Sequence, residues 1–207
     1  MGRACVIIDY GMGNLQSVVN ALRYLDVDPI VSSDPKLVRD ADTLLLPGVG
    51  SFRKAMDELN ASGLAEAIQH AVTVQHHKIL GICLGQQLMA EFGTEDGGCN
   101  GLGLVPGVVD RISQPSGGQI KVPHVGFNRV SFEPESRLFY GFEGPVDCYF
   151  VHSYSLGVQA RPGLAALCDY GAPFVAAYEN DNLYCTQFHP EKSQTNGLRI
   201  LSNFISA

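Results

Sequence analysis

The sequence predicts an α/β fold with a mostly parallel central sheet, helices on both faces, and antiparallel strands added in the second half. Near-continuous apolar runs alternate with helical patterns up to Phe92, which is typical of a parallel sheet covered on both faces. The segment Lys78–Met89 passes abruptly from an apolar strand pattern to a helical pattern. Beyond Phe92, short apolar runs are separated by Pro and Gly, as in antiparallel hairpins.

The first half is expected to contain buried strands, each followed by helical structure. The expected strands are Ala4–Asp9, Pro29–Val31, Asp42–Leu46 and the run that ends at Cys83. The expected helices are Asn14–Leu25, Lys36–Ala41, Ser51–Leu59, Gly63–Gln75 and Leu84–Met89. The first of these helices is predicted because Leu15, Val18 and Leu22 form an apolar stripe at helical spacing.

The second half is expected to add antiparallel strands at one edge of the sheet. Their expected positions are Gly107–Ile112, Gln119–Val122, Phe127–Phe132, Asp147–Ser153, Leu164–Cys168, Val175–Glu179 and Leu183–Phe188. Thr94–Gly103 is expected to be a glycine-rich loop, and Thr195–Ile205 a closing helix capped by Thr195 or Asn196. Because the sequence shows no internal repeat, low-complexity tract or linker, we expect a single domain over residues 1–207.

The composition limits the classes of function. Of the 207 residues, 45% are apolar and 17% are charged, which allows a sizeable core. The net charge of −7 disfavours nucleic acid or an anionic membrane as the main partner, because both need a basic surface. The six cysteines form no CxxC pair and show no zinc-ligand spacing, so we expect a cytoplasmic protein without a metal ion or other cofactor. No apolar run is long enough to predict a membrane span.

Cys83 stands where a strand is expected to turn sharply into a helix, with Gly81 and Gly85 on either side. This is the spacing of a nucleophile elbow, in which side chains cannot be accommodated where strand and helix nearly touch. The helix N-terminus favours a thiolate at Cys83, and the N–H of Leu84 is placed to stabilise an oxyanion. A cysteine that only packs in the core is the alternative, and the flanking glycines favour the catalytic interpretation.

The loop Pro47–Gly50 follows the third expected strand and should lie at the same sheet edge as Cys83. A glycine-rich loop there can offer a second N–H to an oxyanion, from Val49 or Gly50. A plain turn explains this loop equally well.

Gln187–Glu191 contains a candidate base with its carboxylate. His189 can take a proton from a thiol and return it to a leaving group. Residues two apart in an extended segment point the same way, so Glu191 is expected to orient His189. His124 and His152, near strand ends, are weaker candidates to contact these residues.

Gln87, one helical turn after Cys83, points back toward it and offers an amide to a polar substrate. Together these residues predict acyl transfer through a thioester, and they leave the acyl donor open.

Several motifs resemble those of a known family. The segments GICLGQQL at 81–88, LPGVGSF at 46–52 and QFHPEKS at 187–193 resemble the class I, or triad, glutamine amidotransferases. Further segments closely resemble the glutaminase subunits of imidazole glycerol phosphate synthase, which belong to that family. That resemblance rests on DYGMGNLQSV at 9–18, GLGLVPGVVDRI at 101–112, KVPHVGFN at 121–128 and FVHSYS at 150–155.

The resemblance implies an activity and roles for the residues. The activity is hydrolysis of L-glutamine to glutamate, with ammonia passed to a (β/α)8-barrel cyclase partner in histidine biosynthesis. Cys83 would be the nucleophile, His189 the general base and acid, and Glu191 its orienting carboxylate.

The family also implies binding roles. The backbone groups that would serve the oxyanion are those of Val49, Gly50 and Leu84. The residues that would hold glutamine are Gly48, Gln87, Ser153 and Tyr154. The residues implied at the interface with the cyclase are Asn14, Phe127 and Lys192.

One departure from the family pattern leaves alternatives open. The usual PHMGWN segment has Val125 and Phe127 here, and the chain contains no Trp. Phe keeps an aromatic face but loses an N–H donor, which leaves room for a paralogue that serves another pathway. An elbow-cysteine hydrolase or peptidase is a further alternative.

Two alternatives without this chemistry are weaker. A dinucleotide-binding module is suggested by Gly11, Gly13 and Asp34, but Gln16 occupies the place of the third glycine. A catalytically silent regulatory subunit is disfavoured because Cys83, His189 and Glu191 are all present.

Overall fold

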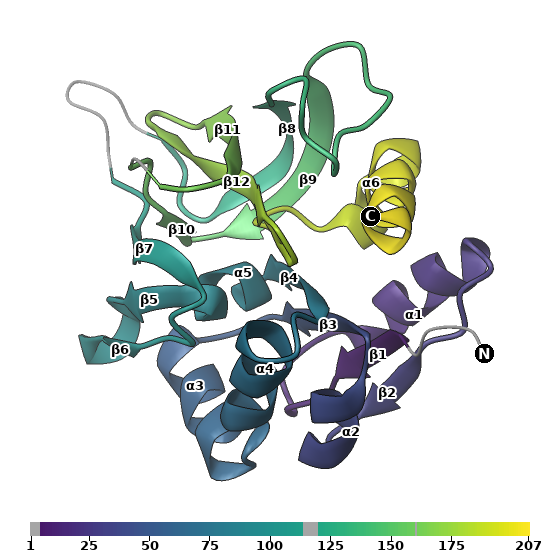
Figure 1. Ribbon diagram of the computed structural model, residues 1–207. Coiled ribbons are helices and arrows are strands. Elements are labelled where there is room, and N and C mark those ends of the chain that lie inside the picture. Colours follow the sequence, from purple (N-terminus) through teal and green to yellow (C-terminus); the bar gives the residue numbers. More distant parts are fainter. Residues whose placement is uncertain (1–4, 114–119, 160) are drawn as a thin grey trace.

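Two sheets organise the residues that the computed structural model describes, namely 5–113, 120–159 and 161–207 (Figure 1). The larger sheet has nine strands in the order β2-β1-β3-β4-β13-β12-β11-β8-β9, and the smaller has four in the order β10-β7-β5-β6. The strands of the larger sheet are β1 Cys5–Ile8, β2 Ile30–Ser32, β3 Thr43–Gly48, β4 Lys78–Cys83, β8 His124–Ser131, β9 Val146–His152, β11 Leu164–Asp169, β12 Pro173–Asn180 and β13 Leu183–Thr186. Those of the smaller sheet are β5 Ala90–Gly93, β6 Cys99–Asn100, β7 Val105–Arg111 and β10 Tyr154–Leu156.

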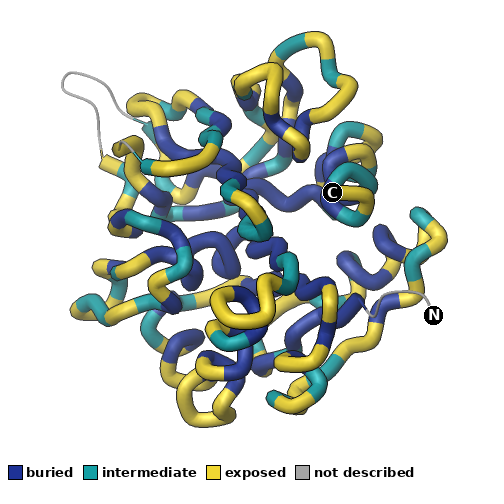
Figure 2. Tube along the Cα trace, viewed as in Figure 1, coloured by how far each residue is buried: buried dark blue, intermediate teal, exposed yellow. Residues whose placement is uncertain are grey.

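The parallel half of the larger sheet is covered on both faces, which confirms the predicted fold class. Strands β2, β1, β3, β4 and β13 pair in parallel. Val6 and Ile8 of β1 join the core formed with α2–α5, whereas Ile7 joins the core formed with α1 and α6. The helices are α1 Leu15–Tyr24, α2 Pro35–Asp40, α3 Phe52–Ala61, α4 Leu64–Thr73, α5 Leu84–Met89 and α6 Gln194–Ser206. Figure 2 shows the central strands buried between these layers.

The second half departs from the prediction in its sheet arrangement. Strands β12, β11, β8 and β9 extend the larger sheet in antiparallel fashion, as expected. The prediction that all added strands are antiparallel and lie at one edge was wrong. Strand β7 pairs instead with β5 and β10 in the smaller sheet, and β13 pairs in parallel with β4 inside the larger one. Strand β5, immediately after α5, was not predicted, and the expected loop Thr94–Gly103 contains β6 and a 3₁₀ turn, η1 Glu95–Gly97.

Two further expectations need correction. Of the expected strand Gln119–Val122, Gln119 lies outside the described residues and the remainder forms no strand. Helix α6 is preceded by Ser193 as its N-cap residue, not by Thr195 or Asn196. The Ser193 hydroxyl makes no capping bond, because it donates to the His189 carbonyl and accepts from the Tyr149 N–H.

The turn from β4 into α5 has the close packing that an elbow requires. Cys83 has φ 55° and ψ −107°, a conformation that is costly for a residue with a side chain. A Cβ on Gly85 would overlap the Leu46 carbonyl oxygen of β3, and one on Gly81 would lie 2.8 Å from the Gly85 oxygen. Both flanking positions therefore need glycine because backbone approaches backbone there.

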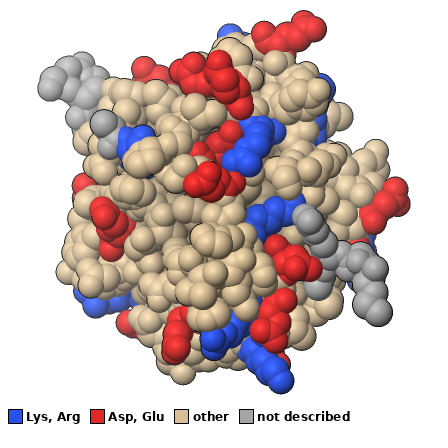
Figure 3. Space-filling view, viewed as in Figure 1, with Lys and Arg blue, Asp and Glu red and all other residues tan. Residues whose placement is uncertain are grey.

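In the described part of the chain, no helix combines the length and apolarity needed to cross a bilayer. On the face drawn in Figure 3, acidic and basic side chains are interspersed over the surface. This mixed pattern differs from the continuous basic surface that a nucleic-acid partner requires.

Gly85→Ala is expected to lower the free energy of unfolding by about 3 kcal/mol, because the new methyl group overlaps the backbone of β3. Urea unfolding would measure the loss. Gly144→Ala is the matched control, since a Cβ at Gly144 meets no atom within 4 Å. Equal losses in the two variants would contradict the close packing described for the elbow.

Candidate active site

The structure brings Cys83 and the segment after β13 to the same edge of the larger sheet. Cys83 ends β4, and β13 pairs in parallel with β4, with Thr186 opposite Ile82. Because parallel strands end at the same edge, the chain that leaves β13 reaches His189 beside the elbow.

His189 and Glu191 form a buried pair. Nδ1 of His189 lies 2.8 Å from Oε1 of Glu191, and the two side chains are only 4% and 3% exposed. The backbone of His189 is held on both sides, since its N–H donates to the Tyr149 carbonyl at 2.9 Å and its carbonyl accepts from Ser193 Oγ at 2.7 Å. The pair does not lie on one extended segment, as predicted, because Glu191 is in a 3₁₀ turn, η2 Pro190–Lys192, which brings the carboxylate to the ring.

The electrostatics of the pair favour a protonated imidazole. Burial lowers the pKa of His189, but interactions with Cys83 and Glu191 outweigh burial and raise the pKa to about 9. The second ring nitrogen, Nε2, is buried, and hydrogen bonding to Cys83 as well as the charge of Cys83 contributes to the raised pKa. His189 is therefore charged at neutral pH when Cys83 is a thiolate.

The loop after β3 borders Cys83 directly. Gly48, the last residue of β3, pairs with Cys83 across the sheet. Val49 is exposed, and Gly50 has a φ of 124°, where the loop turns away. Leu84, the first residue of α5, follows Cys83 directly.

Tyr10 is a neighbour of the site that the sequence analysis did not identify. A Cβ on Gly48 would overlap the Tyr10 hydroxyl, which explains the glycine at that position. The hydroxyl is buried and has no hydrogen-bond partner among the described residues. Burial raises the pKa of Tyr10, and the negative charge of Cys83 raises it further. The hydroxyl is thus a neutral donor beside the site.

Gln87 and the predicted Ser153–Tyr154 segment also lie at the site, and three of their polar groups make hydrogen bonds within the protein. Gln87 Nε2 donates to the Tyr154 carbonyl at 2.8 Å and to Gln187 Oε1 at 3.0 Å. The Ser153 carbonyl accepts from the Ile112 N–H at 2.9 Å.

Gln187, the first residue of the QFHPE motif, is a further neighbour of Cys83 that the sequence did not identify. It is fully buried, and its Nε2 lies 3.7 Å from Cys83 Sγ. Gln187 stands two residues before His189, so the alternation of an extended segment places both side chains on the same side and is the signal that could have identified Gln187.

The residues predicted at a partner interface lie on the surface next to the His189 segment. Phe127 is 50% exposed and packs edge-on against Tyr149, whose carbonyl holds the backbone of His189. Lys192 is exposed in η2, and Asn14 is exposed immediately before α1, which packs against η2.

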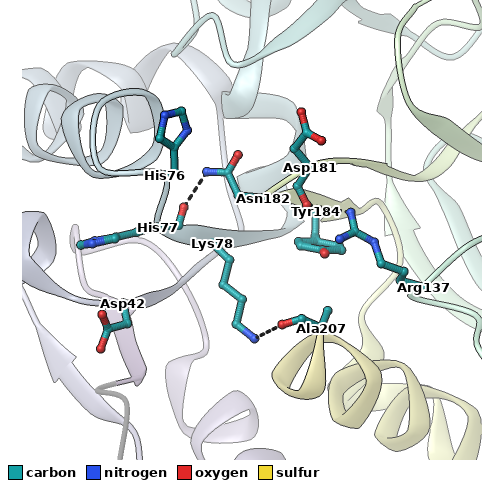
Figure 4. A pocket seen from close by; sticks show the side chains of 9 residues that line it. All are labelled: Asp42, His76, His77, Lys78, Arg137, Asp181, Asn182, Tyr184 and Ala207. Atoms are coloured by element: carbon teal, nitrogen blue, oxygen red, sulfur yellow. Dashed lines mark hydrogen bonds between the residues drawn. The ribbon is translucent and has the colours of Figure 1, made fainter.

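A pocket of about 350 Å³ lies at the opposite, amino-terminal end of β3 and β4 (Figure 4). Lys78 enters it from β4 and donates to the carbonyls of Phe204 and Ile205, which fixes the last turn of α6. Its other lining residues are Asp42, His76, His77, Arg137, Asp181, Asn182, Tyr184 and Ala207. This hollow contributes no residue to the site at Cys83.

The feature that suggested a dinucleotide site has a structural explanation. Asp34 is the N-cap of α2, where its Oδ1 accepts from the Lys36 N–H at 2.9 Å. In the described residues, no cluster of three or more His, Cys, Asp and Glu side chains is arranged to hold a metal ion.

The chain is similar to known proteins over nearly its whole length. A model of the glutamine amidotransferase class-I family matches residues 6–207. The imidazole glycerol phosphate synthase subunit HisH of Syntrophotalea carbinolica is 46% identical, with 96% of this chain and 98% of that protein covered. The corresponding HisH subunit of Moorella thermoacetica is 44% identical, with 98% and 94% covered.

Solved structures show the same fold at low sequence identity. PurLQS from Thermotoga maritima superposes with a TM-score of 0.73 at 17% identity, covering 100% of this chain and 99% of that chain. The glutaminase domain of Trypanosoma brucei CTPS with bound acivicin superposes with a TM-score of 0.62 at 18% identity, covering 97% and 92%. The chain therefore belongs to the class I glutamine amidotransferase family, and within it to the HisH subunits of imidazole glycerol phosphate synthase.

Proposed function

We propose that this chain is a glutaminase that hydrolyses L-glutamine at Cys83 and delivers ammonia to a (β/α)8-barrel cyclase partner in imidazole glycerol phosphate synthase. The observation that carries the proposal is the buried His189–Glu191 pair beside a cysteine elbow. Family membership supports glutamine as the substrate and a synthase complex as the setting. We further propose that residues 1–207 act as one domain.

In the first half-reaction, the Cys83 thiolate attacks the side-chain amide carbon of glutamine. The oxygen of the tetrahedral intermediate becomes negative and is stabilised by backbone N–H groups of Leu84 and of Val49 or Gly50. His189, already protonated, donates its proton to the departing nitrogen. The carbon–nitrogen bond breaks, ammonia leaves, and a thioester to Cys83 remains.

In the second half-reaction, His189 is neutral and takes a proton from water as the water oxygen attacks the thioester carbon. The carbon–sulfur bond then breaks, which releases glutamate and restores the thiolate and the imidazolium. Glu191 stays ionised and holds the ring in the tautomer that leaves Nε2 free for both transfers.

Substrate and partner are assigned to different groups of residues. Gly48, Gln87 and the Ser153–Tyr154 backbone are proposed to hold the amino-acid end of glutamine. Asn14, Phe127 and Lys192 are proposed to contact the cyclase, because they are exposed next to the segment that carries His189.

The paralogue is retained as a second candidate, because Phe127 is half-exposed and, unlike the Trp of the PHMGWN pattern, has no N–H donor. A peptidase is a weaker candidate, since Cys83 is only 5% exposed and a peptide chain would need a wider opening.

A glutamine-analogue electrophile is expected to label Cys83 in the complex with the cyclase, and Cys83→Ala is expected to lower glutaminase kcat by at least about 1,000-fold. Peptide mapping would identify the labelled cysteine, and glutamate release would measure turnover. Cys99→Ala is the matched control, because Cys99 is partly exposed and lies away from the elbow. Turnover retained in Cys83→Ala would refute the assigned nucleophile.

Cys83→Ala is also expected to lower the pKa of His189 from about 9, because the variant removes the thiolate that favours the imidazolium. The ring would then lose its proton at lower pH than in the wild type. An NMR titration of the His189 ring protons would measure the change, with Cys99→Ala again as control. An unchanged titration would show that Cys83 and His189 do not interact.

A further inference from the structure

We propose that Gln187 is a positioning residue for the nucleophile: its side-chain N–H holds the Cys83 sulfur, and a hydrogen-bond chain anchored at the Tyr154 carbonyl sets its orientation. The assignment rests on the proposed function only in that Cys83 is taken as the nucleophile. It concerns how the sulfur is held before any substrate reacts.

The anchor of the chain is a backbone carbonyl, which can only accept hydrogen bonds. The Tyr154 oxygen is approached by Gln87 Nε2 at 2.8 Å and by His152 Nδ1 at 2.8 Å. Both nitrogens must therefore be donors. This fixes the amide orientation of Gln87 and places the proton of His152 on Nδ1.

The orientation of Gln187 follows from that of Gln87. The NH₂ group of Gln87 also lies 3.0 Å from Gln187, so Gln187 must present its oxygen there. Its nitrogen then faces Cys83 Sγ at 3.7 Å, a normal N–H···S separation. Gln187 is fully buried, and its backbone N–H donates to the Ala176 carbonyl at 2.7 Å, so the side chain is held in place.

The hydrogen-bond chain ends at His152 and His124, which are neutral and tightly packed. Because His152 Nδ1 donates, its Nε2 accepts from His124 Nδ1 at 3.0 Å. His124 stacks on Tyr170 with ring centroids 3.9 Å apart. Burial lowers the pKa of both histidines to about 4, so neither gains a proton near neutral pH and the donor order is preserved.

The groups around the Cys83 sulfur interact differently with its thiol form and its thiolate form. As a thiol, Cys83 can donate only weakly to the Val151 carbonyl, 3.9 Å away. As a thiolate it is an acceptor, which is what the Gln187 N–H requires. His189 contributes a positive charge, and Tyr10, also close enough to feel the charge of Cys83, stays neutral. Gln187 is thus a neutral donor that selects and orients the thiolate.

The test compares two Gln187 variants with a matched control. Gln187→Met removes the donor and keeps the length of the side chain, and Gln187→Glu replaces the donor with an acceptor. Gln86→Met is the control. Gln86, in α5, is as buried as Gln187, and its Nε2 donates to the Val175 carbonyl and not to Cys83. The measurement is the rate of Cys83 alkylation by iodoacetamide against pH, resolved by peptide mapping.

Both Gln187 variants are expected to shift the midpoint of the Cys83 alkylation rate to a pH about one unit higher, whereas Gln86→Met leaves the midpoint unchanged. In the complex with the cyclase, Gln187→Met is expected to lower glutaminase kcat by about tenfold with little change in KM. A wild-type profile in both Gln187 variants, or an equal shift in Gln86→Met, would overturn the assignment. A shift specific to Gln187 in a protein that hydrolyses no glutamine would preserve this assignment and reject the proposed function.

Discussion

The parallel pairing of β13 with β4 is the constraint on which the site depends. Gln187 and Cys83 are 104 positions apart in the sequence, yet the register of these two strands makes them neighbours. Because both strands run in the same direction, the segment after β13 and the elbow after β4 emerge at one edge of the sheet. No local property of either segment could produce this contact.

Burial makes the charges of the site depend on one another. Cys83, His189 and Glu191 are almost inaccessible to water, and an isolated charge at any of these positions would be unfavourable. A thiolate at Cys83 and a carboxylate at Glu191 would each compensate an imidazolium at His189. The same low exposure strengthens their attraction, which is why the pKa of His189 rises despite burial. The positive charge of His189 therefore depends on both of its neighbours, Cys83 and Glu191.

The antiparallel strands of the second half do more than extend the sheet. Strand β9 supplies the Tyr149 carbonyl that holds the backbone of His189, and β10 supplies the Tyr154 carbonyl that orients Gln87. Strand β10 belongs to the smaller sheet, so that sheet also contributes to the geometry around Cys83. On one side of Cys83, the glycines of the elbow let the backbone segments approach closely. On the other side, the Tyr149 and Tyr154 carbonyls accept the hydrogen bonds that hold His189 and Gln87.

The sequence by itself determined the alternation of strands and helices, the elbow at Cys83, and the proximity of His189 to Glu191. These features depend on residues within a few positions of one another, and periodicity and motif spacing report on that range. Only the tertiary structure decided the separate smaller sheet, the use of Ser193 to hold His189, and the roles of Tyr10 and Gln187. Each of these depends on which distant strands pair and in what register, and a linear pattern carries no such information.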